Sequence, residues 1–216
     1  MSQDSPLVVT SSPPVTGRSA RAPWWEEDGR PRIDRVALAR FGIILVIVVE
    51  AMTFGGLISA FLSIKASLHE WPPLDQPRFP MAATAINTAI LLASGVTLFF
   101  FRRQYRQEES TSRQLTSLLA ATALLGTLFV SLQGVEWARL IGYGLTITSS
   151  SYGSIFYVII GFHALHVVCG LLCLGIVSWV AVTSNFPRRL ASLEVVSFFW
   201  FFVVLVWPIL YGIVYF

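Results

Sequence analysis

Five long apolar stretches constrain this chain more than any other feature of its sequence. They cover approximately residues 36–64, 80–101, 114–135, 153–183 and 191–216. An α-helix rises about 1.5 Å per residue, so each stretch is long enough to cross the roughly 30 Å hydrocarbon layer of a bilayer. Because backbone groups in lipid must be hydrogen-bonded within their own segment, we expect an all-α bundle of five transmembrane helices.

The composition agrees with this class of protein. Charged residues make up 12% of the chain, about half the share in a soluble domain, and the mean hydropathy is +0.68. Residues 1–35 are polar and rich in Ser, Pro and Arg, which predicts a disordered or surface-bound tail ahead of a membrane domain over 36–216. The net charge is only +3, with no basic patch interleaved with aromatics, so nucleic acid is not an expected partner.

The basic residues predict the orientation of the chain. Twelve of the fifteen Lys and Arg residues lie in the segment up to Arg40 and in the connections after the second and fourth stretches. The opposite side has only Lys65, Arg78 and Arg139. Since cytoplasmic loops are enriched in Lys and Arg, we expect a cytoplasmic N-terminus and a C-terminus on the periplasmic or outer side.

Glu50 is the most costly residue within the apolar stretches. It follows Arg40 by ten residues, or roughly 15 Å of helix, which places it near the bilayer midplane if Arg40 marks the inner interface. An ionised carboxylate at that depth is expensive, so we expect Glu50 to be protonated or paired. It is then either a proton-handling carboxyl or a neutral hydrogen-bond donor that joins two helices.

Two histidines stand three residues apart in the stretch GFHALHVVCG at 161–170. At this spacing the two imidazoles lie about 60° apart on one face of a helix. His163 is eleven residues from Tyr152, or roughly 16 Å from the outer edge, which is close to the expected level of Glu50. We therefore expect a Glu50–His163 contact if the first and fourth spans are neighbours.

The same helix carries a metal-like pattern, because His166, Cys169 and Cys173 repeat at i, i+3 and i+7. Structural zinc usually takes four ligands, and two thiolates in an apolar helix are costly, so packing is favoured over metal binding. The third histidine, His69, lies in or beside the outer loop. Three histidines are too few for a haem pair and a copper centre, so we expect no metal or cofactor in this chain.

The remaining polar residues of the spans predict helix packing and anchoring. Gln133 and Glu136 are expected near the outer end of the third span, where a carboxylate is tolerated. Glu194 is expected at the start of the fifth span, where an acid favours a helix N-terminus. Four further residues are expected to form hydrogen bonds between helices: Asn87, Thr88, Ser94 and Thr97.

Five motifs, in this order, resemble subunit III of the haem-copper terminal oxidases, over residues 36–216. They are GIILVIVVEAMTFGGLISAF, WPP followed by INTAILLASGVT, FVSLQGVEW, SSSYGSIFYVIIGFHALHVVCG, and a final helix with Glu194, Trp200, Trp207 and Tyr211. In this resemblance Glu50 matches the family's buried carboxyl and Glu136 the acid of its Gln-x-x-Glu motif. His163 and His166 match its paired histidines.

The resemblance implies an accessory subunit without a redox centre, bound directly to catalytic subunit I and in one complex with subunit II. Haem and copper then belong to partner subunits, and this chain stabilises the catalytic subunit and supports its proton uptake during O2 reduction and proton pumping. The resemblance also implies bound phospholipid, cytochrome c as electron donor of the complex, and a bacterial inner membrane. Larger members have two more N-terminal helices, whereas five-helix members occur in bacteria.

Three alternatives stay open at this point. Within the family, a subunit of a quinol oxidase or an accessory protein of a nitric oxide reductase has a similar sequence. From another class, a small proton or ion carrier would use Glu50 and the histidines as its path. A membrane metal chaperone would use the stripe formed by His166, Cys169 and Cys173.

Overall fold

The computed structural model describes residues 35–67, 81–107, 111–184 and 191–215. Their regular secondary structure consists of five helices: α1 (Arg35–Ser67), α2 (Met81–Arg106), α3 (Ser112–Gly142), α4 (Ser151–Thr183) and α5 (Ala191–Tyr215). All five are long and apolar enough to cross a membrane, which confirms the all-α prediction of five spans. The tail predicted over 1–35 lies outside the described residues except for Arg35, and so does His69.

Two helices continue well past the apolar stretches that predicted them. The second ends at Arg106 rather than near 101, and the third ends at Gly142 rather than near 135. Both extensions contain polar or charged residues, which a helix tolerates once it leaves the hydrocarbon layer. Hydropathy marks the lipid-crossing part of a helix, so it predicts the existence of these helices better than their ends.

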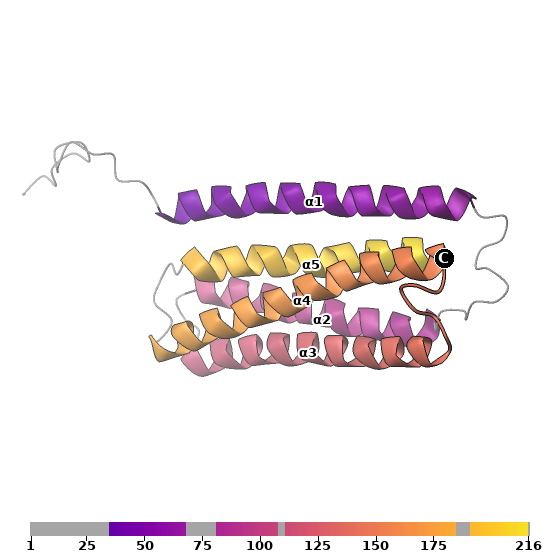
Figure 1. The fold of residues 1–216 in the computed structure, drawn as a ribbon. Helices are drawn as coiled ribbons and strands as arrows, with labels where there is room; N and C mark the ends of the chain where they lie inside the picture. The colour runs from indigo at the N-terminus through magenta and orange to yellow at the C-terminus, as the bar shows by residue number, and fades with distance from the viewer. Residues whose placement is uncertain (1–34, 68–80, 108–110, 185–190, 216) are drawn as a thin grey trace, which may run out of the picture. The chain divides into compact units, whose positions relative to one another are not determined.

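Four of the described helices form a closed bundle: α2 contacts α3, α3 contacts α4, α4 contacts α5, and α5 contacts α2. The remaining helix, α1, packs on the outside of this bundle against α4 and α5 (Figure 1). Only 11% of the most apolar window of α1 is buried, against 50% for α5. The fifth helix is therefore the centre of the packing, and α1 is the least embedded helix.

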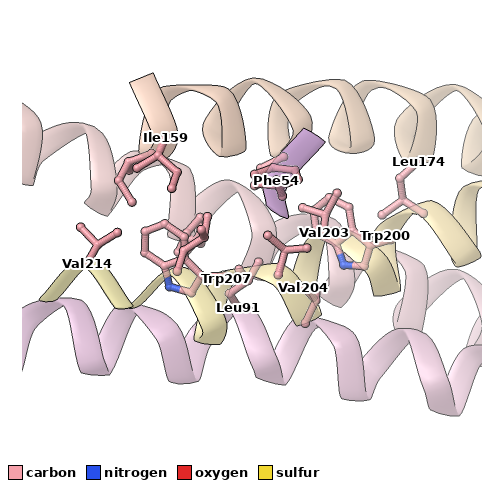
Figure 2. Close-up of a cluster of buried hydrophobic side chains, with 14 of the residues drawn as sticks. Phe54, Leu91, Ile159, Leu174, Trp200, Val203, Val204, Trp207 and Val214 are labelled. Atoms are coloured by element: carbon pink, nitrogen blue, oxygen red, sulfur yellow. The ribbon is translucent and has the colours of Figure 1, made fainter. Parts of the chain in front are cut away.

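The core is built around two fully buried tryptophans of α5, Trp200 and Trp207. Figure 2 shows them among apolar side chains of the other helices, which include Phe54, Leu91, Ile159 and Leu174. The indole of Trp200 lies between two glycines. A Cβ atom on Gly126 of α3 would come within 2.7 Å of the ring, and one on Gly170 of α4 within 2.9 Å.

The connection between α3 and α4 has a well-defined local structure. Gly144 adopts a φ of 89°, and the amides of Gly144 and Leu145 donate to the carbonyls of Ile141 and Leu140 at 3.0 Å each. This pattern is the Schellman motif that ends many helices, and it favours glycine at the left-handed position. Ser150 then caps α4 by accepting from the amide of Gly153 at 3.1 Å. The relative position of α3 and α4 is thereby set by a short, hydrogen-bonded turn.

Candidate functional site

The hydrogen bond between Glu50 and His166 joins α1 to α4 within the membrane-spanning part of the bundle. Glu50 Oε2 lies 3.0 Å from His166 Nε2, and the side chains are 26% and 10% exposed. The other ring nitrogen, Nδ1, lies 2.8 Å from the carbonyl oxygen of Phe162. Because a carbonyl oxygen has no proton to donate, Nδ1 must carry the proton of that bond.

This assignment leaves two consistent states for the pair. A neutral imidazole with its proton on Nδ1 can only accept at Nε2, so the Glu50 carboxyl must then be protonated and donate. Alternatively the imidazole is cationic and donates from Nε2 to an ionised carboxylate. Both states have zero net charge and differ only in which end of one hydrogen bond holds the proton, and a neutral pair is the form that an apolar medium favours.

The pairing corrects the expected contact between Glu50 and His163. Neither ring nitrogen of His163 has a hydrogen-bond partner among the described residues. Its ring instead stacks on Trp207 at a centroid distance of 4.9 Å and meets the edge of Phe129 at 6.4 Å. Depth along a helix does not specify how the helix is rotated about its axis. In the structure α1 packs on the side of α4 that carries His166, whereas His163 points into the bundle.

Aromatic side chains pack against the imidazole of the Glu50–His166 pair. Phe54 follows Glu50 by one turn of α1 and is 3% exposed. Its ring centroid lies 5.2 Å from Phe162, 5.4 Å from the His166 ring and 6.1 Å from Phe202 of α5. These contacts exclude water from the imidazole side of the bond and fix the orientation of the ring that Glu50 meets.

A second polar cluster joins α2 to α3. Asn87 donates to Gln133 and to the carbonyl of Phe129, both at 3.2 Å, and Glu136 accepts from Thr84 at 3.0 Å and from Gln133 at 3.2 Å. Glu136 is only 7% exposed, so its carboxyl is buried between the two helices. Since α3 continues to Gly142, Glu136 lies inside the helix, and its two hydrogen bonds offset the cost of burial.

A charged contact lies at the end of the bundle where α1 and α5 begin. Glu194, in the first turn of α5 as expected, forms an ion pair with Arg40 of α1, whose Nη2 lies 2.8 Å from Oε1. Arg106 of α2 approaches the same carboxylate at 3.9 Å. The sequence predicted the position of Glu194 but not its partners. Arg40 and Glu194 were both expected at the cytoplasmic interface, and this common depth could have suggested the ion pair.

The hydroxyl groups of α2 bond across to other helices, which confirms the expected role of Thr88, Ser94 and Thr97. Thr88 accepts from the indole nitrogen of Trp207 at 2.9 Å, and Ser94 accepts from that of Trp200 at 3.3 Å. The hydroxyl of Thr97 lies 2.8 Å from that of Thr122. Sequence reasoning named Trp200 and Trp207 only as members of the motif of the last helix, and it did not predict them as hydrogen-bond partners.

The stripe formed by His166, Cys169 and Cys173 does not form a metal-binding arrangement in the structure. Cys169 and Cys173 are free thiols exposed on the surface of α4, whereas His166 points to Glu50. Among the residues that the structure describes, no three His, Cys, Asp or Glu side chains are arranged to hold a metal ion.

A family profile and individual relatives both connect this chain to the same family of membrane proteins. The sequence profile of the family described as cytochrome c oxidase subunit III matches residues 34–216. The chain is 33% identical over 186 residues to "Probable cytochrome c oxidase subunit 3" of Mycobacterium leprae, covering 85% of this chain and 90% of that protein. It is 30% identical over 180 residues to "Cytochrome c oxidase subunit 3" of Synechocystis sp. (82% and 75%) and 36% identical over 179 residues to the protein of that name from Gallus gallus (80% and 67%).

Proposed function

Since the chain belongs to the cytochrome c oxidase subunit III family and is an accessory subunit of a haem-copper oxidase, we propose that it binds the catalytic subunit and supports its proton uptake. In this proposal the chain itself holds no redox centre. Haem and copper reside in partner subunits I and II, of which subunit I is contacted directly, and cytochrome c supplies the electrons. The relatives support this donor over quinol and over nitric oxide reduction, because their names specify cytochrome c oxidase.

The observation that carries the proposal is the Glu50–His166 hydrogen bond. A carboxyl and an imidazole that share one proton can take up or release a further proton without any change in the backbone. The aromatic contacts of Phe54 hold the imidazole in place during such a change. This is the chemistry that an accessory subunit needs if it is to buffer or position protons for a neighbouring catalytic subunit.

The proposed location is a bacterial inner membrane, with the N-terminus in the cytoplasm. Five apolar helices and the family relatives support a multi-pass membrane protein, and the distribution of Lys and Arg supports the orientation. In this orientation the Arg40–Glu194 ion pair lies at the cytoplasmic face. We further propose that phospholipid covers the exposed apolar side chains of the helices, such as Leu45, Val49 and Met52 of α1.

The two alternatives from other classes gain less support. A proton carrier needs polar groups that continue from Glu50 and His166 through the bundle, but the next histidine, His163, is enclosed by Trp207 and Phe129. A metal chaperone needs thiols and an imidazole that point toward one common site. Both cysteines are exposed on the surface of α4, whereas the His166 imidazole is hydrogen-bonded to Glu50.

Purification in mild detergent tests the proposed assembly. A tagged full-length chain should bring with it a haem-copper catalytic subunit, detectable by mass spectrometry and by haem absorbance. Recovery of the intact chain without such a subunit would contradict the proposal.

The variant Glu50→Gln tests the proposed role of the pair. A glutamine amide can still donate a hydrogen bond to His166 Nε2, but it cannot release a proton. We therefore expect normal assembly and a loss of oxidase activity during sustained turnover. Thr53→Val on the same helix is the matched control, because its hydroxyl bonds only to the Val49 carbonyl, one turn earlier, among the interactions described. Unchanged turnover in Glu50→Gln would assign Glu50 to packing alone.

A further inference from the structure

A chain of hydrogen bonds leads to Glu136, and its direction is fixed where it begins. Asn87 Nδ2 lies 3.2 Å from the carbonyl oxygen of Phe129 and 3.2 Å from Gln133 Oε1. Because a backbone carbonyl has no proton to donate, the Asn87 atom at this position must be the amide nitrogen. The Gln133 side chain therefore presents its oxygen to Asn87 and its nitrogen to Glu136.

The direction of these bonds identifies which carboxyl oxygen of Glu136 can carry a proton. Oε2 lies 3.2 Å from Gln133 Nε2 and 3.0 Å from the hydroxyl oxygen of Thr84. An amide nitrogen only donates, so Oε2 is an acceptor, and Glu136 is either ionised or has its proton on Oε1. Neither of the two bonds involves Oε1. A proton can therefore bind to Oε1 and leave it again without a rearrangement of the side chains around Oε2.

Glu136 lies at the end of the bundle where α2 begins and α3 ends. It precedes the last residue of α3, Gly142, by six positions, or roughly 9 Å, and Thr84 follows the first residue of α2, Met81, by three positions. The 31 residues of α3 span about 46 Å, which exceeds the roughly 30 Å hydrocarbon layer by about 8 Å at each end if the excess is shared equally. The Glu136 carboxyl is then at the edge of the hydrocarbon layer, within about two helical turns of the aqueous phase.

The groups around Glu136 act on its two protonation states in opposite directions. The charged group that interacts with it is Arg139, exposed one turn later on α3. The α5 helix contributes Tyr215, which interacts with Tyr152 of α4, and both phenols are neutral near pH 7. The described α2 side chain that bonds to the carboxyl is neutral. Two hydrogen bonds and one cation favour the carboxylate and burial favours the neutral acid, and this balance is what a group that exchanges protons requires.

We propose that Glu136 is a second proton-binding site of this chain, at which the carboxylate takes up a proton on Oε1 while Oε2 keeps its hydrogen bonds to Gln133 and Thr84. A hydronium ion of the adjacent aqueous phase transfers one proton to the carboxylate and becomes a water molecule. The products are a neutral acid and water, and nothing is oxidised or reduced.

This site is at the end of the bundle opposite to the Arg40–Glu194 ion pair. Arg106 at the last position of α2 approaches Glu194, whereas Thr84 is in the first turn of α2. In the proposed orientation Glu136 therefore faces the outer side, to which an oxidase of this kind pumps protons. The role proposed for Glu50 concerns proton uptake, so the two carboxyls serve different steps and the evidence for one does not depend on the other.

Infrared difference spectroscopy of the intact oxidase complex tests this site. The C=O stretching band of protonated carboxyl groups is followed as the pH is lowered from about 9 to about 4, in the wild type and in Glu136→Gln. We expect a band that appears reversibly within this range in the wild type and is absent from the variant. Glu50→Gln should retain this band, which separates the Glu136 site from the role proposed for Glu50.

The variant Thr84→Val keeps the test decisive if Glu136→Gln does not assemble. It removes one of the two donors to Oε2 and so destabilises the carboxylate. The midpoint of the band should move to higher pH by about one to two units, the size expected for the loss of one hydrogen bond to a charged group. Thr97→Val is the matched control, because its hydroxyl also joins α2 to α3, at Thr122, but is thirteen residues farther along α2. Its midpoint should equal that of the wild type.

Three results would overturn the proposal. A Glu136 band present at every pH would show a permanently neutral acid with a role in packing alone. A band absent at every pH would show a permanent carboxylate. Equal midpoints in Thr84→Val and the wild type would show that the Thr84 hydroxyl does not stabilise the ionised form.

Discussion

The substitution Gly126→Ala tests how tightly the centre of the bundle is packed. The added methyl carbon would lie 2.7 Å from two ring carbons of Trp200 and 2.9 Å from Cδ2 of Leu171. Optimal contacts between carbon atoms are about 3.5–4.0 Å, so the ring would have to move by roughly 1 Å. It has no free direction for this movement, because the backbone of α4 at Gly170 lies against the indole as well.

The expected loss of stability follows from these contacts. Overpacking of a filled core typically costs about 1–3 kcal/mol, and displacement of Trp200 also weakens its hydrogen bond to Ser94, worth about 0.6 kcal/mol in a membrane bundle. The helix propensity of alanine partly offsets this loss. Gly134→Ala on the same helix has that propensity gain without any contact within 4 Å, so it is the matched control. We expect Gly126→Ala to be less stable than Gly134→Ala by about 2–3 kcal/mol.

The assay is unfolding of the purified full-length chain in mixed micelles, titrated with SDS and followed by circular dichroism and tryptophan emission. The free energies of unfolding of the two variants are compared at the same detergent composition. A difference below about 0.5 kcal/mol would show that Trp200 is free to shift, and it would refute the view that the two glycines hold the indole in place.

Three further outcomes follow from the contacts between helices. Glu50→Leu leaves the Nε2 atom of His166 without its partner, so it should lower the free energy of unfolding by about 1–3 kcal/mol. Glu50→Gln can still donate to Nε2 and should stay near the wild type in the same SDS titration. Equal losses in the two variants would contradict the Glu50–His166 hydrogen bond. Arg40→Gln removes an ion pair to Glu194 whose arginine side chain is 48% exposed, so we expect the free energy of unfolding to fall by less than about 1 kcal/mol. This loss should shrink with added salt, and a loss that does not depend on salt would contradict a screened surface ion pair. A double-mutant cycle of Thr88→Val and Trp207→Phe should give a coupling energy of about 0.6 kcal/mol, and a value of zero would deny the indole–hydroxyl bond.

Much of the fold was predictable from the sequence because lipid imposes simple rules on a chain. A stretch with few charges that is long enough to cross the bilayer is expected to be helical, and this rule predicted all five helices. The helix ends were less predictable, since α3 continues through Glu136 to Gly142 without any change in its backbone hydrogen bonding.

The candidate site was predictable in its residues but not in its pairs. Charge cost in lipid singled out Glu50, and spacing placed both histidines on one face of α4. The choice between His163 and His166 depends on the rotation of α4 against α1, which is decided by packing of Phe54 and Phe162 at the interface. Tertiary contacts of this kind leave no periodic signal in a single sequence, and for the same reason the bond from Trp207 to Thr88 was not foreseen.

The peripheral position of α1 has a consequence for the synthesis of the protein. Glu50 enters the membrane with the first helix, but its partner His166 is 116 residues later in the chain. At translation rates of about 5–20 residues per second, the carboxyl must wait roughly 6–23 s in the bilayer before the imidazole can be inserted beside it. Glu194, the partner of Arg40, is made later still, at 154 residues' separation. During this interval α2 and α3 are made, but α1 packs on neither of them, so the acid near its middle stays without its partner until the last two helices are inserted.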